Sequence, residues 1–179
     1  MSRPAVFFDR DGVVNVSPGA GYVLNWSQFH FSPGAISALR LCKECGYATV
    51  LVTSQQGVGK GLMTQADLDE IHQRMQDALA SEGAAFDAIH ACTCLAEDPD
   101  CTCRKPSPEM ILTSQDQLDL DLSRSWLIGD ADRDIEMAQN AGVPRTIRIV
   151  SDAHPVGVTA TLTLSTTELL ADSLRDLLD

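Results

Sequence analysis

The sequence predicts an α/β fold, a Rossmann-like parallel sheet with helices on both faces. Three observations lead to this prediction. Short apolar runs recur along the chain and stop at charged residues or glycine, as strands buried in a parallel sheet do. Segments with helical apolar spacing separate these runs. No large insertion follows either of the first two runs, so we expect no large cap domain and a single domain over residues 1–179.

The expected strands are short and apolar, and the charged or small residues that follow them mark their ends. Right-handed crossovers between parallel strands would place all of their carboxyl ends at one edge of the sheet. The strands are expected at residues 5–8, 48–52, 88–91, 126–128 and 146–150.

The expected helices are indicated by apolar spacing and by capping residues. Residues 34–45 have helical apolar spacing. Thr64 and Asp67 resemble a capping box before the second helix. Ser107 and Pro108 indicate the N-cap and the first residue of the third. The remaining helices are expected at 132–141 and 167–178, whereas 152–166 show no interpretable pattern.

The net charge of the chain limits the kinds of molecule that it can bind. Thirteen basic against 25 acidic residues give a net charge of −12, which argues against nucleic acid or an anionic membrane as a partner. An anionic substrate would therefore need local cations. No apolar run is long enough to span a membrane, and the N-terminus does not resemble a signal peptide. We therefore expect a cytoplasmic protein, and a monomer, that binds a small molecule.

Polar residues follow the expected strands at the shared edge. Asp9 and Asp11 follow the first strand, Thr53 ends the second and Asp130 follows the fourth. Arg104 and Lys105 precede a helix nearby, and Asp134 lies four residues after Asp130. Each aspartate alone could be only a turn residue or a helix N-cap. Together they predict one site that contains carboxylates, a hydroxyl and a lysine.

This set of groups suits phosphoryl chemistry. Carboxylates from separate strands suit Mg²⁺, and a lysine with a hydroxyl suits a phosphoryl group. Asp9 could attack phosphorus as a nucleophile, while Asp11 could donate and then accept a proton. Asp130 would complete the metal site and Asp134 would orient it. We expect the Arg10 side chain to turn away, because side chains alternate along an extended segment.

Four cysteines, Cys92, Cys94, Cys101 and Cys103, form two C-x-C pairs within one short segment. Four thiolates are the ligand set of a closed structural zinc site, and zinc is the favoured interpretation of this loop, residues 92–103. The alternatives are two disulfides or four free thiols. Cys42 and Cys45 are expected to serve packing rather than redox chemistry.

The motif order D-x-D-G-x-x-N, Thr, Lys and G-D-x-x-x-D resembles the haloacid dehalogenase (HAD) phosphatase superfamily over nearly the whole chain. The resemblance implies a HAD-like fold, with Asp9 as nucleophile and Asp11 as general acid/base. It implies Mg²⁺ bound by the Asp9 carboxylate, the Asp11 backbone carbonyl and the Asp130 carboxylate. It also implies that Thr53 and Lys105 stabilise the transferring phosphoryl group.

The cysteine segment runs directly into Arg-Lys-Pro, which resembles the branch that contains the heptose bisphosphate and histidinol-phosphate phosphatases. That branch usually has Cys-x-His where this chain has Cys92-x-Cys94, and often has Lys where this chain has Ala131. The resemblance implies that the zinc is structural and that its loop aims Arg104 and Lys105. It further implies substrate contacts from Gly21, Tyr22, Ser54, Gln55, Gln56 and Arg104.

The expected function is therefore Mg²⁺-dependent hydrolysis of a sugar phosphate, with D-glycero-D-manno-heptose 1,7-bisphosphate favoured. Histidinol-phosphate hydrolysis is the alternative enzyme activity. The alternative of another class is a non-catalytic phospho-binding or zinc-dependent interaction protein on the same scaffold. The histidines His30, His72 and His154 show no ligand spacing, so we expect no chemical role for them.

Overall fold

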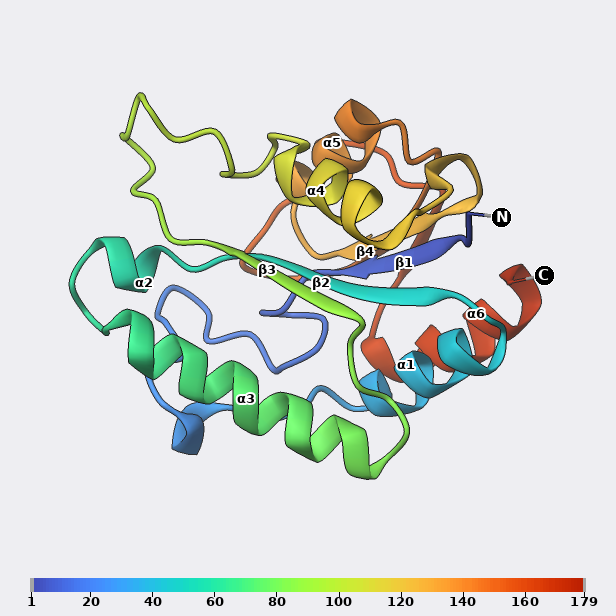
Figure 1. Ribbon diagram of the computed structural model, residues 1–179, viewed down its shortest axis with the longest axis horizontal. Coiled ribbons are helices and arrows are strands. Elements are labelled where there is room, and N and C mark those ends of the chain that lie inside the picture. The colour runs from blue at the N-terminus through green and yellow to red at the C-terminus, as the bar shows by residue number, and fades with distance from the viewer. Residues whose placement is uncertain (1, 179) are drawn as a thin grey trace.

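The structure of the protein, a computed structural model, describes residues 2–178. Its centre is a six-stranded, fully parallel sheet with the strand order β3-β2-β1-β4-β5-β6 (Figure 1). This architecture confirms the predicted α/β class. The strands are β1 (Ala5–Phe8), β2 (Ala48–Ser54), β3 (Ala88–Cys92), β4 (Trp126–Gly129), β5 (Arg145–Ile149) and β6 (Leu162–Leu164).

Helices cover both faces of the sheet, with α1, α3 and α6 on one side and α4 and α5 on the other (Figure 1). Three short 3₁₀ turns, Trp26–Gln28, Leu122–Arg124 and Thr167–Leu169, complete the connections. The helices are α1 (Ala35–Glu44), α2 (Gln56–Gly59), α3 (Gln65–Ser81), α4 (Glu109–Leu118), α5 (Asp132–Ala141) and α6 (Leu170–Leu177).

The core forms two layers because the side chains of each strand alternate between the two faces. In β1, Val6 and Phe8 pack toward α1 and α3, whereas Ala5 and Phe7 pack toward α4 and α5. All four residues are buried, so the strand reads as a continuous apolar run. A strand buried on both faces is a rigid support for whatever follows its carboxyl end.

Several element boundaries differ from the expected ones. α4 begins at Glu109, and Pro108 rather than Ser107 is its N-cap residue. Ile111 and Leu112 both donate their backbone N–H to the Pro108 carbonyl, so the first turn closes there. The last helix begins with a 3₁₀ turn, and α6 itself starts at Leu170. The capping box of Thr64 and Asp67 at the start of α3 is confirmed.

Two short elements were not expected from the sequence. α2 is a single turn within the glycine-rich segment after β2, and β6 is a three-residue strand within the segment that showed no pattern. β6 exists through its pairing with β5, as in the register of Ile149 with Leu164. Strands of this length carry too little periodicity to be recognised alone.

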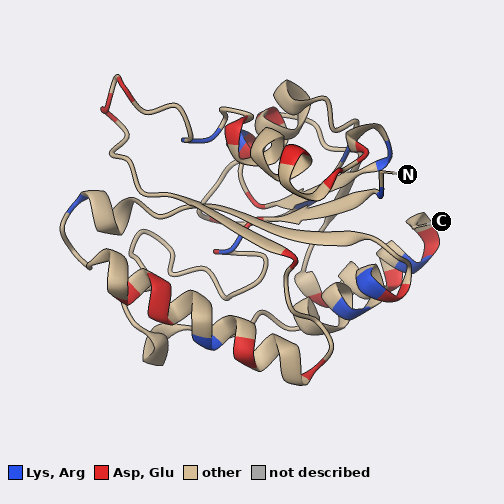
Figure 2. Cartoon of the chain, viewed as in Figure 1, with Lys and Arg blue, Asp and Glu red and all other residues tan. Residues whose placement is uncertain are grey.

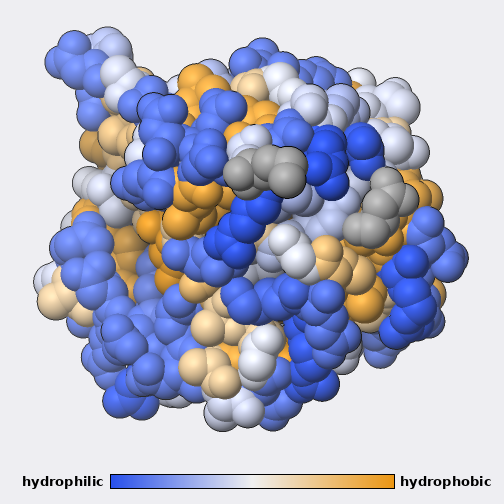
Figure 3. Space-filling view, turned by 45° about the vertical axis from the view of Figure 1, so that its right-hand side comes forward, coloured by the Kyte–Doolittle hydropathy of each residue, from blue (hydrophilic) through white to orange (hydrophobic). Residues whose placement is uncertain are grey.

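Acidic residues are spread over the outer helices, and basic residues occur in the loop before α4 (Figure 2). That loop, between β3 and α4, projects from the body of the domain (Figure 1). Hydrophobic residues form patches interrupted by hydrophilic ones on the face seen in Figure 3. Among residues 2–178, no helix combines the length and the apolar character that crossing a membrane requires.

Candidate active site

The end of β1 places two aspartates at the carboxyl edge of the sheet. The Asp9 backbone N–H donates to the Ile128 carbonyl at 2.9 Å, which ties the first aspartate to β4. The chain then turns sharply at Gly12, whose φ is +87°. A Cβ at Gly12 would also overlap the Asp130 carboxylate. Glycine is therefore required there both for the turn and for the approach of Asp130.

Lys105 joins the carboxylates of two different elements. Its Nζ lies 2.7 Å from Asp9 Oδ1 and 2.7 Å from Asp134 Oδ1, and all three side chains are buried. The second Asp134 oxygen accepts the backbone N–H groups of Asp130 and Ala131, at 3.2 and 3.0 Å. Both Asp134 oxygens are therefore engaged. Asp134 contacts Lys105 and the start of α5, whereas the role expected from the sequence, orientation of the metal site, stays a prediction.

The remaining carboxylates fit a magnesium ion. Oxygen atoms of Asp9, Asp130 and Asp134 all lie within 4.8 Å of one another. Asp130 Oδ2 is buried and has no hydrogen-bond partner in the described residues. A buried carboxylate oxygen without a partner is costly unless a cation satisfies it. Because Asp134 is engaged elsewhere, Asp9 and Asp130 are the side chains that would hold the ion, and oxygen ligands match Mg²⁺.

Burial and the neighbouring charges shift the pKa values of the aspartates at this edge. Burial raises the pKa of Asp9 to about 7, the nearby Asp134 carboxylate adds to the effect, and Lys105 opposes it. Burial and then Asp134 raise the pKa of Asp130 to about 6. Burial disfavours the charged form of Lys105, but Asp134 and Asp9 nevertheless raise the pKa of this lysine. The site carries excess negative charge that a divalent cation would offset.

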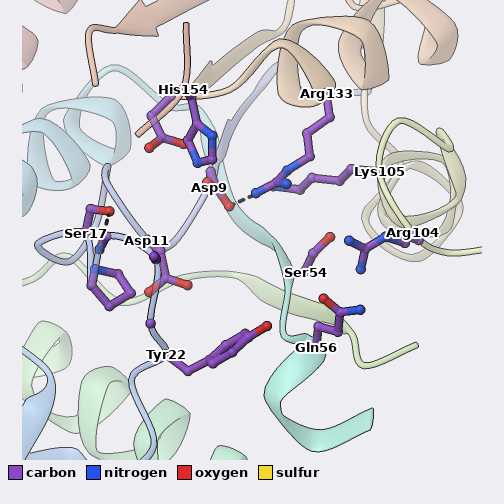
Figure 4. A pocket seen from close by; sticks show the side chains of 15 residues that line it. Asp9, Asp11, Ser17, Tyr22, Ser54, Gln56, Arg104, Lys105, Arg133 and His154 are labelled. Atoms are coloured by element: carbon purple, nitrogen blue, oxygen red, sulfur yellow. Dashed lines mark hydrogen bonds and ion pairs between the residues drawn. The ribbon is translucent and has the colours of Figure 1, made fainter. Parts of the chain in front are cut away.

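Asp11 has a different environment from Asp9. Its carboxylate accepts hydrogen bonds from Asn15 Nδ2 at 3.0 Å and Gln55 Nε2 at 2.9 Å, and it pairs with Arg10. Burial acts to raise the pKa of Asp11, but Arg10 and the two amides together lower it. The carboxylate lies apart from the Asp9–Lys105 pair and toward Tyr22 (Figure 4).

A pocket of about 190 Å³ lies at this edge, and Asp9, Asp11, Lys105 and Asp130 are among the residues that line it. Most residues expected to contact substrate line it, namely Gly21, Tyr22, Ser54, Gln56 and Arg104 (Figure 4). Two expected site residues, Thr53 and Gln55, are buried and do not line the pocket. Gln55 is only 2% exposed, and its amide donates to Asp11 and to Thr53 Oγ1. Gln55 therefore holds other site residues and does not face the pocket.

Two pocket residues were missed in the sequence. Arg133 lines the pocket from the first turn of α5, and His154 lines it from the segment between β5 and β6 (Figure 4). That segment is held by Asp132, which accepts the backbone N–H of Gly157 at 3.0 Å and pairs with buried Arg148 at 2.7 Å. Arg133 follows Asp130 by about one helical turn, and this spacing could have predicted its position at the pocket. His154 is placed only by tertiary contacts.

The four cysteine sulfurs of the loop lie within 4.8 Å of one another. Three pairs are separated by 3.6 Å (Cys92–Cys101), 3.7 Å (Cys94–Cys103) and 3.8 Å (Cys101–Cys103). Tetrahedral zinc with Zn–S bonds of about 2.3 Å places its sulfurs about 3.8 Å apart, so these spacings fit the ion. The sulfurs of Cys92 and Cys103 are in bonding contact.

The chain is similar in sequence to known proteins. The sequence profile of the HAD-hydrolase-like family matches residues 102–177. The D-glycero-beta-D-manno-heptose-1,7-bisphosphate 7-phosphatase of Yersinia pestis is 38% identical over 162 residues, which cover 87% of this chain and 85% of the relative. The D-glycero-alpha-D-manno-heptose-1,7-bisphosphate 7-phosphatase of Burkholderia mallei is 36% identical over 89% of this chain and 87% of its own length.

A solved structure is similar to this chain in both fold and sequence. The D,D-heptose 1,7-bisphosphate phosphatase from B. bronchiseptica, crystallised with magnesium and phosphate, superposes with a TM-score of 0.87. It is 30% identical, and the match covers 97% of this chain and 98% of that one. Sequence identity over most of the length of each relative and a shared fold identify the family of this chain. This protein belongs to the HAD-like hydrolases, in the family of the D-glycero-D-manno-heptose-1,7-bisphosphate 7-phosphatases.

Proposed function

We propose that the protein is a Mg²⁺-dependent phosphatase that acts on a sugar bisphosphate, D-glycero-D-manno-heptose 1,7-bisphosphate. The observation that carries this proposal is the arrangement of Asp9, Lys105 and Asp130 beneath a pocket that also contains Arg104 and Arg133. A nucleophile, a metal site and two further cations then face the same small volume. The names of the relatives and of the magnesium- and phosphate-bound neighbour support this substrate class.

The first step would form a covalent intermediate on Asp9. A carboxylate oxygen attacks phosphorus, and the bond from phosphorus to the ester oxygen breaks. The departing sugar oxygen takes a proton from Asp11, which acts as general acid; because Arg10 and the two amides lower the pKa of Asp11 in the free site, Asp11 must take up this proton when the substrate binds. Lys105, 2.7 Å from the Asp9 carboxylate, keeps the nucleophile oriented and stabilises the charge on the phosphoryl oxygens.

The second step would return the enzyme to its starting state. Asp11, now a carboxylate, removes a proton from water, and the resulting hydroxide attacks phosphorus. The bond between phosphorus and the Asp9 oxygen breaks, so free phosphate and the Asp9 carboxylate are released. When bound at Asp9, the Asp11 carbonyl and Asp130, Mg²⁺ supplies charge stabilisation for the phosphoryl group.

The charges of the pocket favour a bisphosphate over histidinol phosphate. Arg104 and Arg133 line the pocket, and neither forms a salt bridge within residues 2–178. Two guanidinium groups suit a second phosphate, which Arg binds through paired hydrogen bonds. Histidinol phosphate would instead bring its ammonium group toward these cations. The presence of Asp9, Asp11, Thr53 and Lys105 together disfavours a purely non-catalytic function.

The substrate assignment predicts a clear preference in a direct comparison. With Mg²⁺ present, kcat/KM for D-glycero-D-manno-heptose 1,7-bisphosphate should exceed that for histidinol phosphate by at least about a hundredfold, as expected when a charged group is left unpaired. Phosphate release from both compounds, and from p-nitrophenyl phosphate with EDTA as control, measures this. Equal or reversed preference would assign the alternative substrate. The absence of Mg²⁺-dependent release from any of them would contradict the phosphatase proposal.

We further propose that the loop of residues 92–103 binds one structural zinc ion through Cys92, Cys94, Cys101 and Cys103. Three of the sulfur–sulfur spacings and the set of four cysteines support a closed tetrahedral site, whereas the contact between the Cys92 and Cys103 sulfurs would have to open for all four to act as thiolate ligands. Arg104 and Lys105 follow the last ligand directly, and Arg104 donates to the Cys94 carbonyl at 3.4 Å. The ion would therefore fix the position of both cations at the pocket.

The zinc proposal predicts about one zinc per chain after gel filtration under reducing conditions. Cys94→Ser should lower the zinc content and the melting temperature, because a structural ion contributes folding free energy. Cys45→Ser, outside the loop, is the matched control and should retain zinc. Metal analysis and thiol titration separate the alternatives. A folded, zinc-free protein with two free loop thiols would favour a Cys92–Cys103 disulfide. A folded, zinc-free protein with four free loop thiols would exclude both the zinc site and the disulfide.

A further inference from the structure

Two buried polar groups that do not line the active-site pocket, Arg10 and His72, have no place in the mechanism above. Arg10 lies between Asp9 and Asp11 and is fully buried, and its guanidinium NH1 is 3.2 Å from Nε2 of His72. His72 comes from α3 and is 8% exposed. An arginine side chain can only donate, so His72 Nε2 must accept and the imidazole is neutral. Burial and the Arg10 charge lower the pKa of His72 to about 4, consistent with this state.

The other end of the same guanidinium reaches Asp11. Arg10 NH2 lies 3.2 Å from Asp11 Oδ1 and 3.4 Å from Oδ2, so a single nitrogen contacts the carboxylate. Arg10 Nε is buried and has no hydrogen-bond partner within residues 2–178. The guanidinium is therefore held at two points only. One is His72 on α3, and the other is Asp11 at the pocket.

Packing alone does not explain a histidine at this position of α3. The buried face of this helix otherwise consists of apolar residues, Leu68, Ile71, Met75 and Leu79. A buried imidazole costs desolvation free energy and is retained only where it satisfies another polar group. Here the satisfied group is the guanidinium that contacts Asp11. His72 thus links the longest helix of the described chain to the loop that follows β1.

We propose that His72 is a positioning residue that acts through Arg10 on Asp11. By accepting from NH1, His72 prevents the guanidinium from turning both of its NH₂ groups onto the carboxylate as a paired fork. Asp11 is then held by one long contact from Arg10 and by the amides of Asn15 and Gln55, and it remains directed at the pocket. This inference rests on the proposed role of Asp11 as the general acid/base.

The test compares His72→Leu with His72→Gln, whose amide oxygen can replace Nε2 as the acceptor. His72→Leu should lower kcat for the sugar bisphosphate at least about tenfold, with KM changed less than about twofold, because proton transfer contributes a hundredfold or more. His72→Gln should retain kcat within about threefold. With p-nitrophenyl phosphate, whose leaving group needs no proton, His72→Leu should release the first p-nitrophenolate at the normal rate and then turn over slowly.

Met75→Leu is the matched control, a volume-conserving change on the same buried face of α3. Normal kcat in His72→Leu overturns the inference. So does an equal loss of kcat in His72→Leu, His72→Gln and Met75→Leu that follows their melting temperatures, since that result indicates packing alone. Asp11→Asn separates the two proposals. If Asp11→Asn remains active, the proposed mechanism fails. If Asp11→Asn is inactive but His72→Leu has a normal kcat, only the positioning role fails.

Discussion

Asp9→Asn should lower kcat at least about a thousandfold, because a neutral amide cannot attack phosphorus as the carboxylate does. The substitution is nearly isosteric, so the loss would report on the nucleophile and not on the shape of the pocket. Initial rates of phosphate release at saturating Mg²⁺ measure the effect. Mass spectrometry of enzyme quenched during turnover should find a phosphorylated chain in the wild type and none in the variant.

The stability of Asp9→Asn should not fall with its activity. Burial and the Asp134 carboxylate raise the pKa of Asp9 to about 7, so its charged form is unfavourable in the folded state. Removing that charge in EDTA should leave the melting temperature unchanged or raise it. Asp69→Asn, on the exposed face of α3, is the matched control for both measurements. A fully active Asp9→Asn enzyme would exclude Asp9 as the nucleophile.

Lys105→Met should produce the second large effect, in activity and in stability together. Lys105 is the cation between Asp9 and Asp134, and its removal leaves two buried carboxylates unneutralised. Breaking a buried ion pair from one side costs about 3–5 kcal/mol of unfolding free energy. We also expect kcat to fall at least about a hundredfold, because the transferring phosphoryl group loses a positive charge. Urea unfolding in EDTA and steady-state rates measure the two effects.

The pH dependence of this destabilisation has a defined sign. Carboxylates with raised pKa values become protonated as the pH falls, and their mutual repulsion disappears with their charge. The cost of Lys105→Met should therefore be larger at pH 8 than at pH 5. Lys43→Met removes an exposed ion pair with Asp87 and should cost at most about 1 kcal/mol at either pH. Equal costs for the two variants would contradict the buried-charge explanation.

The sequence was informative where a local pattern already carries the function. The apolar run of β1 ends directly at Asp9 and Asp11, and the run of β4 ends at Gly129 and Asp130. Parallel topology is enough to bring such strand ends together. The pairing of Lys105 with Asp9 follows the same logic, since a buried cation requires an anionic partner.

The sequence was less informative where a side chain has two plausible directions. Gln55 adjoins Ser54 and Gln56, which line the pocket, yet its own amide turns inward to Asp11. Arg10 was expected to turn away, and it does leave the pocket wall, but its long side chain folds back to contact Asp11. The direction of a long polar side chain depends on which partners the fold places within hydrogen-bond distance, and a linear pattern does not contain those distances.

The sequence by itself determined five of the six strands, the polar residues that follow their carboxyl ends and the residue types on which the proposed chemistry depends. These properties depend on short-range apolar periodicity and on residue type, which are local. Only the tertiary structure decided that His72 supports Arg10, that His154 and Arg133 face the pocket, and that β6 completes the sheet. Each of these depends on contacts between segments that are distant in the chain, and such contacts form only after the core has packed.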